Sequence, residues 1–149
     1  MSDQVTERMT TAAPPERVYE IVTDFDAYPV WAPDLKEVEV EQRDAEGRAT
    51  HVRFRAAAFG RSINYTLEYS YAEAPARLSW VQTSADITSR IDGTYEFEPC
   101  DGGTTVTYHL EVDLKMPVPG FIKQRTAARI VGTALRHLRA RAEATSATP

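Results

Sequence analysis

Apolar and polar residues alternate with a period of two through most of residues 35–114. The clearest case is residues 62–71, where every second side chain from Ile63 to Tyr71 is aliphatic or aromatic and the intervening ones are polar. This alternation indicates strands with one face covered and the other in water. Short turns, such as Cys100-Asp-Gly-Gly103, join these strands, so we expect them to pair in an antiparallel sheet.

The pattern predicts seven strands. They cover residues 3–12, 35–41, 51–56, 62–71, 78–82, 87–98 and 105–114. Between the first two we expect two short helices. One begins at Ala13-Pro-Pro-Glu16, because proline is well tolerated in a first helical turn. The other is a single turn carrying Trp31, limited by Tyr28-Pro29 and Ala32-Pro33.

The last long segment has a different period. Met116-Pro-Val-Pro-Gly-Phe121 ends the final strand, and the next residues lack proline as far as Glu143. Apolar residues recur there mostly at steps of three and four, which predicts an amphipathic helix; they are Phe121, Ala128, Val131, Leu135, Leu138 and Ala142. We therefore expect one α+β domain over residues 1–149, with a long helix laid across the sheet and a frayed end at 144–149.

Bulk composition fits a globular protein of ordinary kind, with 149 residues, 42% of them hydrophobic and 26% charged. The sequence contains no apolar run long enough to span a bilayer, and its first residues lack the apolar core of a signal peptide. Cys100 is the single cysteine, so an internal disulfide is excluded. A cytoplasmic location is the expectation that follows.

Charge is distributed unevenly. The net charge is −5, yet residues 121–143 contain six basic residues and one acid. This basic helix either pairs with carboxylates of the acidic body or makes a peripheral contact with an anionic membrane or a protein partner. The overall acidity and the lack of a recognition motif argue against nucleic acid as a partner.

The covered face of strands two to seven contains no Asp, Glu, Lys, Arg or His, but five tyrosines. A buried tyrosine needs a partner for its hydroxyl, so such a wall favours a ligand cavity between sheet and helix over a purely aliphatic core. For any one tyrosine, the alternative is a position near a strand end, with its hydroxyl bonded to water or backbone. The predicted cavity residues are Phe54, Tyr65, Tyr69, Trp80, Gln82, Ser89, Tyr95 and Tyr108 from the sheet, and Phe121, Ala128 and Gly132 from the helix.

Candidate catalytic chemistry is sparse. Glu7 shares the parity of Val5 and Met9, so it is a candidate acid or base if that face is buried, and otherwise lies near a strand end or pairs with an arginine. Three scattered histidines give no metal site, and no nucleotide or nucleophile motif is present. The sequence predicts neither a metal nor a cofactor, and it assigns no catalytic residue.

Three segments carry a family resemblance, namely residues 13–31, Gly103-Thr-Thr-Val-Thr-Tyr108 and Met116-Pro-Val-Pro-Gly-Phe121. They resemble the polyketide cyclase/dehydrase and coenzyme Q-binding branch of the START-like, or SRPBCC, superfamily. The resemblance implies a helix-grip fold, with a seven-stranded antiparallel sheet curved around a long C-terminal helix and two short helices after the first strand. It also implies a hydrophobic ligand such as a lipid, an isoprenoid or a polyketide.

Cyclases of this fold are thought to combine a cavity arginine with hydroxyl groups. In this sequence Arg61 begins a strand, and Arg90 occupies one of the alternate positions that face solvent. The predicted inner face therefore has no arginine. The sequence therefore favours binding or transport of a hydrophobic small molecule. A polyketide cyclase/dehydrase is the second hypothesis, and an interaction module that uses the basic helix is the third.

Overall fold

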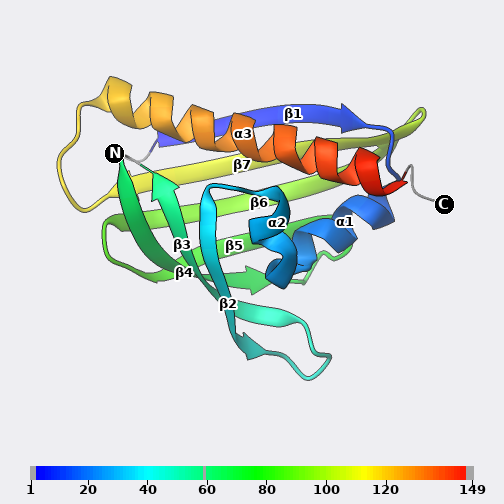
Figure 1. The fold of residues 1–149 in the computed structure, drawn as a ribbon, viewed down its shortest axis with the longest axis horizontal. Helices are drawn as coiled ribbons and strands as arrows, with labels where there is room; N and C mark the ends of the chain where they lie inside the picture. Colours follow the sequence, from blue (N-terminus) through cyan, green and yellow to red (C-terminus); the bar gives the residue numbers. More distant parts are fainter. Residues whose placement is uncertain (1–2, 59, 147–149) are drawn as a thin grey trace.

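The computed structural model describes residues 3–58 and 60–146. Its single sheet has seven antiparallel strands in the order β1-β7-β6-β5-β4-β3-β2, curved around a long helix (Figure 1). The elements are β1 Asp3–Thr11, α1 Pro15–Thr23, η1 Phe25–Ala27, α2 Tyr28–Trp31, β2 Leu35–Arg43, β3 Ala49–Ala58, β4 Arg61–Ser70, β5 Arg77–Ala85, β6 Thr88–Cys100, β7 Gly103–Leu114 and α3 Gly120–Ser146. The predicted α+β helix-grip architecture is confirmed.

The short helices close one end of the sheet. Helix α1 has Pro15 in its first turn, and it buries Val18, Ile21 and Val22. The hydroxyl of Tyr28, at the start of α2, donates a hydrogen bond to the carbonyl of Val22. That bond fixes α2 against the end of α1, so both helices pack as one unit beside the inner face of the sheet (Figure 1).

Helix α3 lies along β1 and β7 and also contacts α1 and α2 (Figure 1). Its buried residues are Ala127, Val131, Leu135, Leu138 and Ala142, spaced at three- and four-residue steps. This confirms most of the predicted apolar stripe. The prediction that Phe121 belongs to it is wrong, because Phe121 is 67% exposed. The first turn of α3 lies beyond the covered part of the helix, so an apolar residue there does not reach the core.

The other end of α3 is firmly attached. The carboxylate of Glu143 accepts hydrogen bonds from the Thr11 hydroxyl at 3.1 Å and from the Ala12 amide at 3.3 Å. The helix continues to Ser146, so residues 144–146 are helical and not frayed as expected, while 147–149 lie outside the described residues. Among the helices described, none combines the length and apolar character that a membrane crossing needs.

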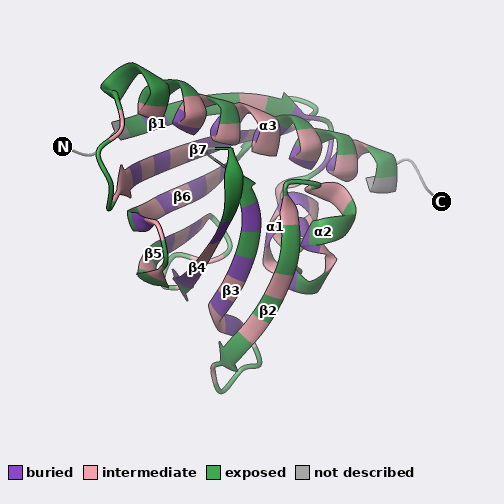
Figure 2. Ribbon diagram, turned by 60° about the vertical axis from the view of Figure 1, so that its left-hand side comes forward, coloured by how far each residue is buried: buried purple, intermediate pink, exposed green. Residues whose placement is uncertain are grey.

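A register shift in β6 reverses the predicted parity at its start. Pairing with β7 moves from Thr88↔Leu114 to Arg90↔Asp113, so one extra residue is accommodated between them. Thr88 is consequently 1% exposed, whereas Ser89 is exposed, contrary to the sequence prediction. Buried and less buried residues alternate along much of the rest of the sheet (Figure 2), except that Thr66 and Leu67 of β4 and residues 106–108 of β7 are buried in succession.

Glu7 is exposed and is not part of the inner wall. It lies on β1, which is an edge strand, opposite Tyr108 of β7. Side chains of an edge strand reach water more easily than those of a central strand, so its shared parity with Val5 does not bury it. The acid or base role considered for Glu7 therefore has no structural support.

Candidate functional site

An inner pocket of about 150 Å³ lies between the sheet, α2 and α3. Strands β2 to β7 supply its sheet wall, and the other side is formed by residues of α2, the α2–β2 connection and α3. Six of the predicted cavity residues line it, namely Phe54, Tyr65, Tyr69, Trp80, Tyr95 and Tyr108. All six share the inner face of the sheet that the alternation predicted for them, and the β4–β5 register shift between Thr66 and Leu67 does not move Tyr65 out of it.

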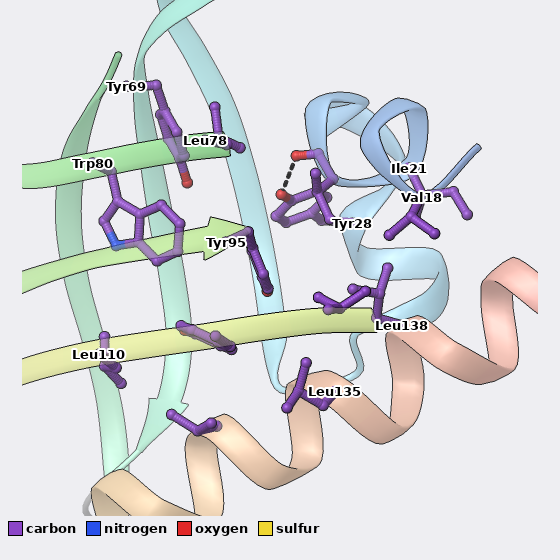
Figure 3. Packing of buried hydrophobic residues seen from close by; sticks show 14 of the residues in the cluster. Val18, Ile21, Tyr28, Tyr69, Leu78, Trp80, Tyr95, Leu110, Leu135 and Leu138 are labelled. Carbon is purple, nitrogen blue, oxygen red and sulfur yellow. Dashed lines mark hydrogen bonds between the residues drawn. The ribbon is translucent and has the colours of Figure 1, made fainter. Parts of the chain in front are cut away.

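Trp80 is the centre of an aromatic cluster on the sheet wall (Figure 3). Its ring centroid lies 5.7 Å from that of Tyr69, 5.4 Å from Tyr95 and 5.8 Å from Tyr108. Tyr95 and Tyr108 are 4.6 Å apart on the same basis. Rings at these separations are in contact and hold one another in place, so the wall is a packed surface that a flat apolar group can lie against.

Four tyrosine hydroxyls are open to the pocket. Those of Tyr65, Tyr69, Tyr95 and Tyr108 make no hydrogen bond within the described part of the chain. Among the described residues, the fully buried side-chain polar atoms that lack a hydrogen-bond partner are the indole nitrogens of Trp31 and Trp80. The four hydroxyl oxygens are not in this group, so they retain some accessible surface. Each can therefore donate a hydrogen bond to, or accept one from, a guest in the pocket.

Tyr71 behaves differently from these four. Its hydroxyl donates to the Ala49 carbonyl at 2.6 Å, and the Arg48 guanidinium lies 4.8 Å from its ring centroid. The sequence left open that the hydroxyl of a given tyrosine could bond to the backbone, and Tyr71 is such a case. Burial raises its pKa to about 12, and the nearby Tyr19 adds to that effect.

Burial also raises the pKa of the four pocket tyrosines above the usual value near 10. For Tyr108 the neighbouring Tyr95 and Tyr65 raise the pKa further, because two phenolates close together would repel. All four are consequently neutral hydroxyl groups at physiological pH. They can polarise an oxygen on a ligand, but none is a base ready to remove a proton.

Two predicted residues of the sheet lie outside the pocket lining. Ser89 is exposed because of the register shift at the start of β6. Gln82 is engaged with Thr88: its amide nitrogen donates to the Thr88 carbonyl at 2.9 Å, and its oxygen accepts from the Thr88 hydroxyl at 2.6 Å. Gln82 thus ties β5 to the start of β6, and Thr88 is the residue that reaches the pocket.

The three residues predicted from α3 also lie outside the lining. Phe121 is exposed, and Ala128 packs against the core cluster beside the pocket. Gly132 faces neither a strand nor the pocket, because a methyl group added there would have the Arg136 guanidinium as its nearest neighbour, at 3.6 Å. Glycine at this position therefore neither permits a close strand contact nor makes room for a guest.

Several lining residues are absent from the set of cavity residues predicted from the sequence. On α3 they are Ile130, Thr133, Ala134 and His137, which follow one another at helical spacing beside the buried Val131–Leu135–Leu138 stripe. Their spacing of three and four residues could have indicated a second face of the helix that is turned toward the pocket. Tyr28 and Trp31 of α2 also line the pocket, and the hydrogen bond from Tyr28 to α1 and its ring contacts with Phe25 and Phe54 hold them there.

A larger, more open groove of about 860 Å³ adjoins the inner pocket. The two share Asp34, Ala57 and Ile130 as lining residues, so the groove is the outer approach to the pocket. The backbone amide of Ala57 donates to the Asp34 carbonyl at 2.9 Å, which holds the α2–β2 connection at the boundary. The groove extends from there to the start of α3.

The basic side chains of α3 differ in what they contact. Lys123 lies 3.3 Å from Asp113 of β7, while Arg139 pairs with Glu143 of its own helix at 3.2 Å. Arg125, Arg129 and Arg136 are exposed. No group of three or more potential metal ligands occurs within residues 3–58 and 60–146, and Cys100 is exposed.

Comparison with known proteins gives a consistent result. Residues 2–143 match the profile of a family described as "Polyketide cyclase / dehydrase and lipid transport". A START superfamily protein from Mycobacterium smegmatis is similar in structure, with a TM-score of 0.89, 25% identity, and coverage of 95% of this chain and 98% of that one. No curated protein matches the sequence.

Two further solved structures share the fold at lower identity. An aromatase/cyclase from Streptomyces sp. R1128 has a TM-score of 0.85 and 17% identity, and the alignment covers 99% of this chain and 98% of that one. A STAR-related lipid transfer protein from Xanthomonas axonopodis has a TM-score of 0.73 and 18% identity, with 93% and 85% covered. At these identities the likeness concerns the fold alone.

Proposed function

Because the chain belongs to the polyketide cyclase/dehydrase and lipid transport family, we propose that it binds and carries a hydrophobic small molecule in the inner pocket. The observation that carries this proposal is the pocket's lining. Aromatic and aliphatic side chains form most of it. Four tyrosine hydroxyls without a hydrogen-bond partner in the described chain are the groups that could bond to polar atoms of a ligand. A lipid, an isoprenoid or a polyketide-like molecule has the matching chemistry.

Apolar burial supplies the affinity in this proposal. Removing apolar surface from water contributes about 25 cal/mol per Å², and the tyrosine hydroxyls orient the guest by its oxygens. A pocket of about 150 Å³ has room for about one ring or a short tail. A longer ligand therefore extends into the adjoining groove, where Met116, Val118 and Ile122 offer further apolar surface.

Native mass spectrometry of the protein isolated from the cells that make it tests this function. A carrier is expected to retain a small apolar molecule of defined mass, which organic extraction releases and re-addition restores. Protein that carries no adduct and takes up none from a total lipid and isoprenoid extract would contradict the proposal.

The unpaired hydroxyls also favour a second candidate function, that of a polyketide cyclase/dehydrase. Neutral tyrosines can polarise the carbonyls of a folded poly-ketone chain and so assist aldol closure and loss of water. Asp34 and His137 are the ionisable groups other than tyrosine among the residues that line the inner pocket, and no arginine is among them. Any proton transfer would fall to those two groups or to water.

Tyr65→Phe and Tyr108→Phe separate the two functions. For a carrier, removing one hydroxyl changes ligand affinity modestly, by the worth of one hydrogen bond, about 0.5–1.5 kcal/mol. For a cyclase, the same change removes turnover of a linear poly-β-ketone thioester. Wild-type protein that binds this thioester without cyclising it would exclude the second function and leave the first.

A further inference from the structure

Two arginines line the groove outside the inner pocket. Arg61 is the first residue of β4, and Arg129 lies on α3, so the sheet and the long helix each contribute one arginine to the groove. Both are exposed. Neither makes an ion pair or a side-chain hydrogen bond within the described part of the chain.

Most arginines on the outside of the sheet are paired instead. Arg53 lies 2.7 Å from Glu39, and Arg90 lies 3.2 Å from Glu111. Arg55 and Arg77 are likewise within 3.5 Å of carboxylates on neighbouring strands. Neither Arg61 nor Arg129 has such a partner among the described residues, although carboxylates are plentiful in a chain of net charge −5, so both guanidinium groups at this opening are available to a ligand.

The rest of the groove lining is chiefly apolar. Ile87, Leu114, Met116, Val118 and Ile122 form much of it, and the side chains of Met116 and Ile122 are each 41% exposed. Asp34 is the one carboxylate among the lining residues, and it lies at the boundary with the inner pocket, outside ion-pair distance of either arginine. The groove thus offers apolar surface and an excess of one positive charge.

From this arrangement we propose that the ligand is an anionic amphiphile. Its apolar part occupies the inner pocket, and its oxyanion head group, a carboxylate or a phosphate, lies in the groove against Arg61 and Arg129. A guanidinium group matches either head group because its planar set of N–H donors can hold two oxygens at once. This inference rests on the proposed binding function and specifies the class of ligand.

Isothermal titration calorimetry on the full chain tests it with three probes of equal chain length: laurate, dodecyl phosphate and dodecanol. The wild-type protein is expected to bind at least one of the two anions about tenfold or more tightly than dodecanol, which corresponds to about 1.4 kcal/mol. Added salt should weaken anion binding and leave dodecanol binding unchanged. Whether laurate or dodecyl phosphate binds better tells which head group is preferred.

The variants Arg61→Gln and Arg129→Gln locate the effect. Together they should remove the preference for anions, a loss of about tenfold, while dodecanol affinity stays at the wild-type value. Arg125→Gln is the matched control, because Arg125 is exposed on the same helix and lines neither pocket nor groove. It removes the same charge and should leave all three affinities unchanged.

Three results would overturn the inference. In the first, dodecanol binds as tightly as both anions. In the second, the Arg61→Gln/Arg129→Gln protein keeps the preference for anions, or Arg125→Gln loses it to the same extent. Either of these leaves the proposed binding function intact. In the third, none of the three probes binds, and this result counts against the binding function as well.

Discussion

The indole of Trp80 lies directly on Gly93, its cross-strand neighbour on β6. A methyl group at position 93 would sit 2.5 Å from Trp80 Cζ2 and 2.8 Å from the His109 carbonyl oxygen. Only glycine leaves the space that the ring occupies there. Trp80 can therefore take its position on the pocket wall only because residue 93 has no side chain. Its contacts with Tyr69, Tyr95 and Tyr108 depend on that position.

Gly93→Ala is accordingly expected to destabilise the protein by about 1–3 kcal/mol, the usual cost of overpacking a core, and to shift the tryptophan fluorescence. Urea unfolding and an emission spectrum measure the two effects. Gly132→Ala is the control, since a methyl there meets nothing closer than Arg136 at 3.6 Å. It should stabilise helix α3 by about 1 kcal/mol. A Gly93→Ala protein as stable as the wild type would contradict the account.

Stability should fall steeply in alkali. Burial raises the folded-state pKa of Tyr28, Tyr65, Tyr69, Tyr95 and Tyr108, whereas in the unfolded chain they ionise near 10. The unfolded state therefore loses protons first as pH rises, so stability is complete below about pH 10 and is lost above it. Between its unfolded-state and folded-state pKa, each such tyrosine lowers the free energy of unfolding by about 1.4 kcal/mol per pH unit.

Absorbance of tyrosinate during a pH titration checks this, with circular dichroism recorded on the same samples. These five tyrosines should ionise together with unfolding. Ionisation of all seven tyrosines near pH 10 in protein that remains folded would show that the pocket is open to bulk water, contrary to the structure.

The basic helix gives a separate prediction about membranes. Arg136 and Arg139 are exposed on α3, so a peripheral contact with an anionic surface would use them. Arg136→Glu/Arg139→Glu should abolish sedimentation with vesicles of phosphatidylserine and phosphatidylcholine, and it should leave uptake of dodecanol unchanged. If the wild-type protein does not sediment with these vesicles, or if the variant does so equally well, the membrane contact is excluded.

The sheet wall of the site was predictable because alternation along a strand fixes which residues share a face. Tyr65, Tyr69, Trp80, Tyr95 and Tyr108 all follow from that rule. It failed at Ser89, because a register shift adds one residue at the start of β6 and brings Thr88 inward. Nothing in the local pattern of polar and apolar residues marks that shift.

The helical side of the site was less accessible to sequence reasoning. Gly132 is small and Phe121 is apolar, yet Gly132 faces Arg136 and not the pocket, and Phe121 is exposed. The inward position of a helical residue depends on how the helix is docked. Here docking is set by long-range contacts, such as those of Glu143 with Thr11 and Ala12. The cytoplasmic location and the ligand itself remain predictions.

Calorimetric binding of dodecanol to a pair of α3 variants tests the central claim most directly. Ala134 lines the inner pocket, whereas Ala140 is exposed on the same helix. The phenyl ring of Ala134→Phe would fill much of a pocket of about 150 Å³, so binding should weaken about tenfold or more with little change in Tm. Ala140→Phe should bind as the wild type does. Undiminished binding by a folded Ala134→Phe protein would contradict the assignment of this pocket as the binding site.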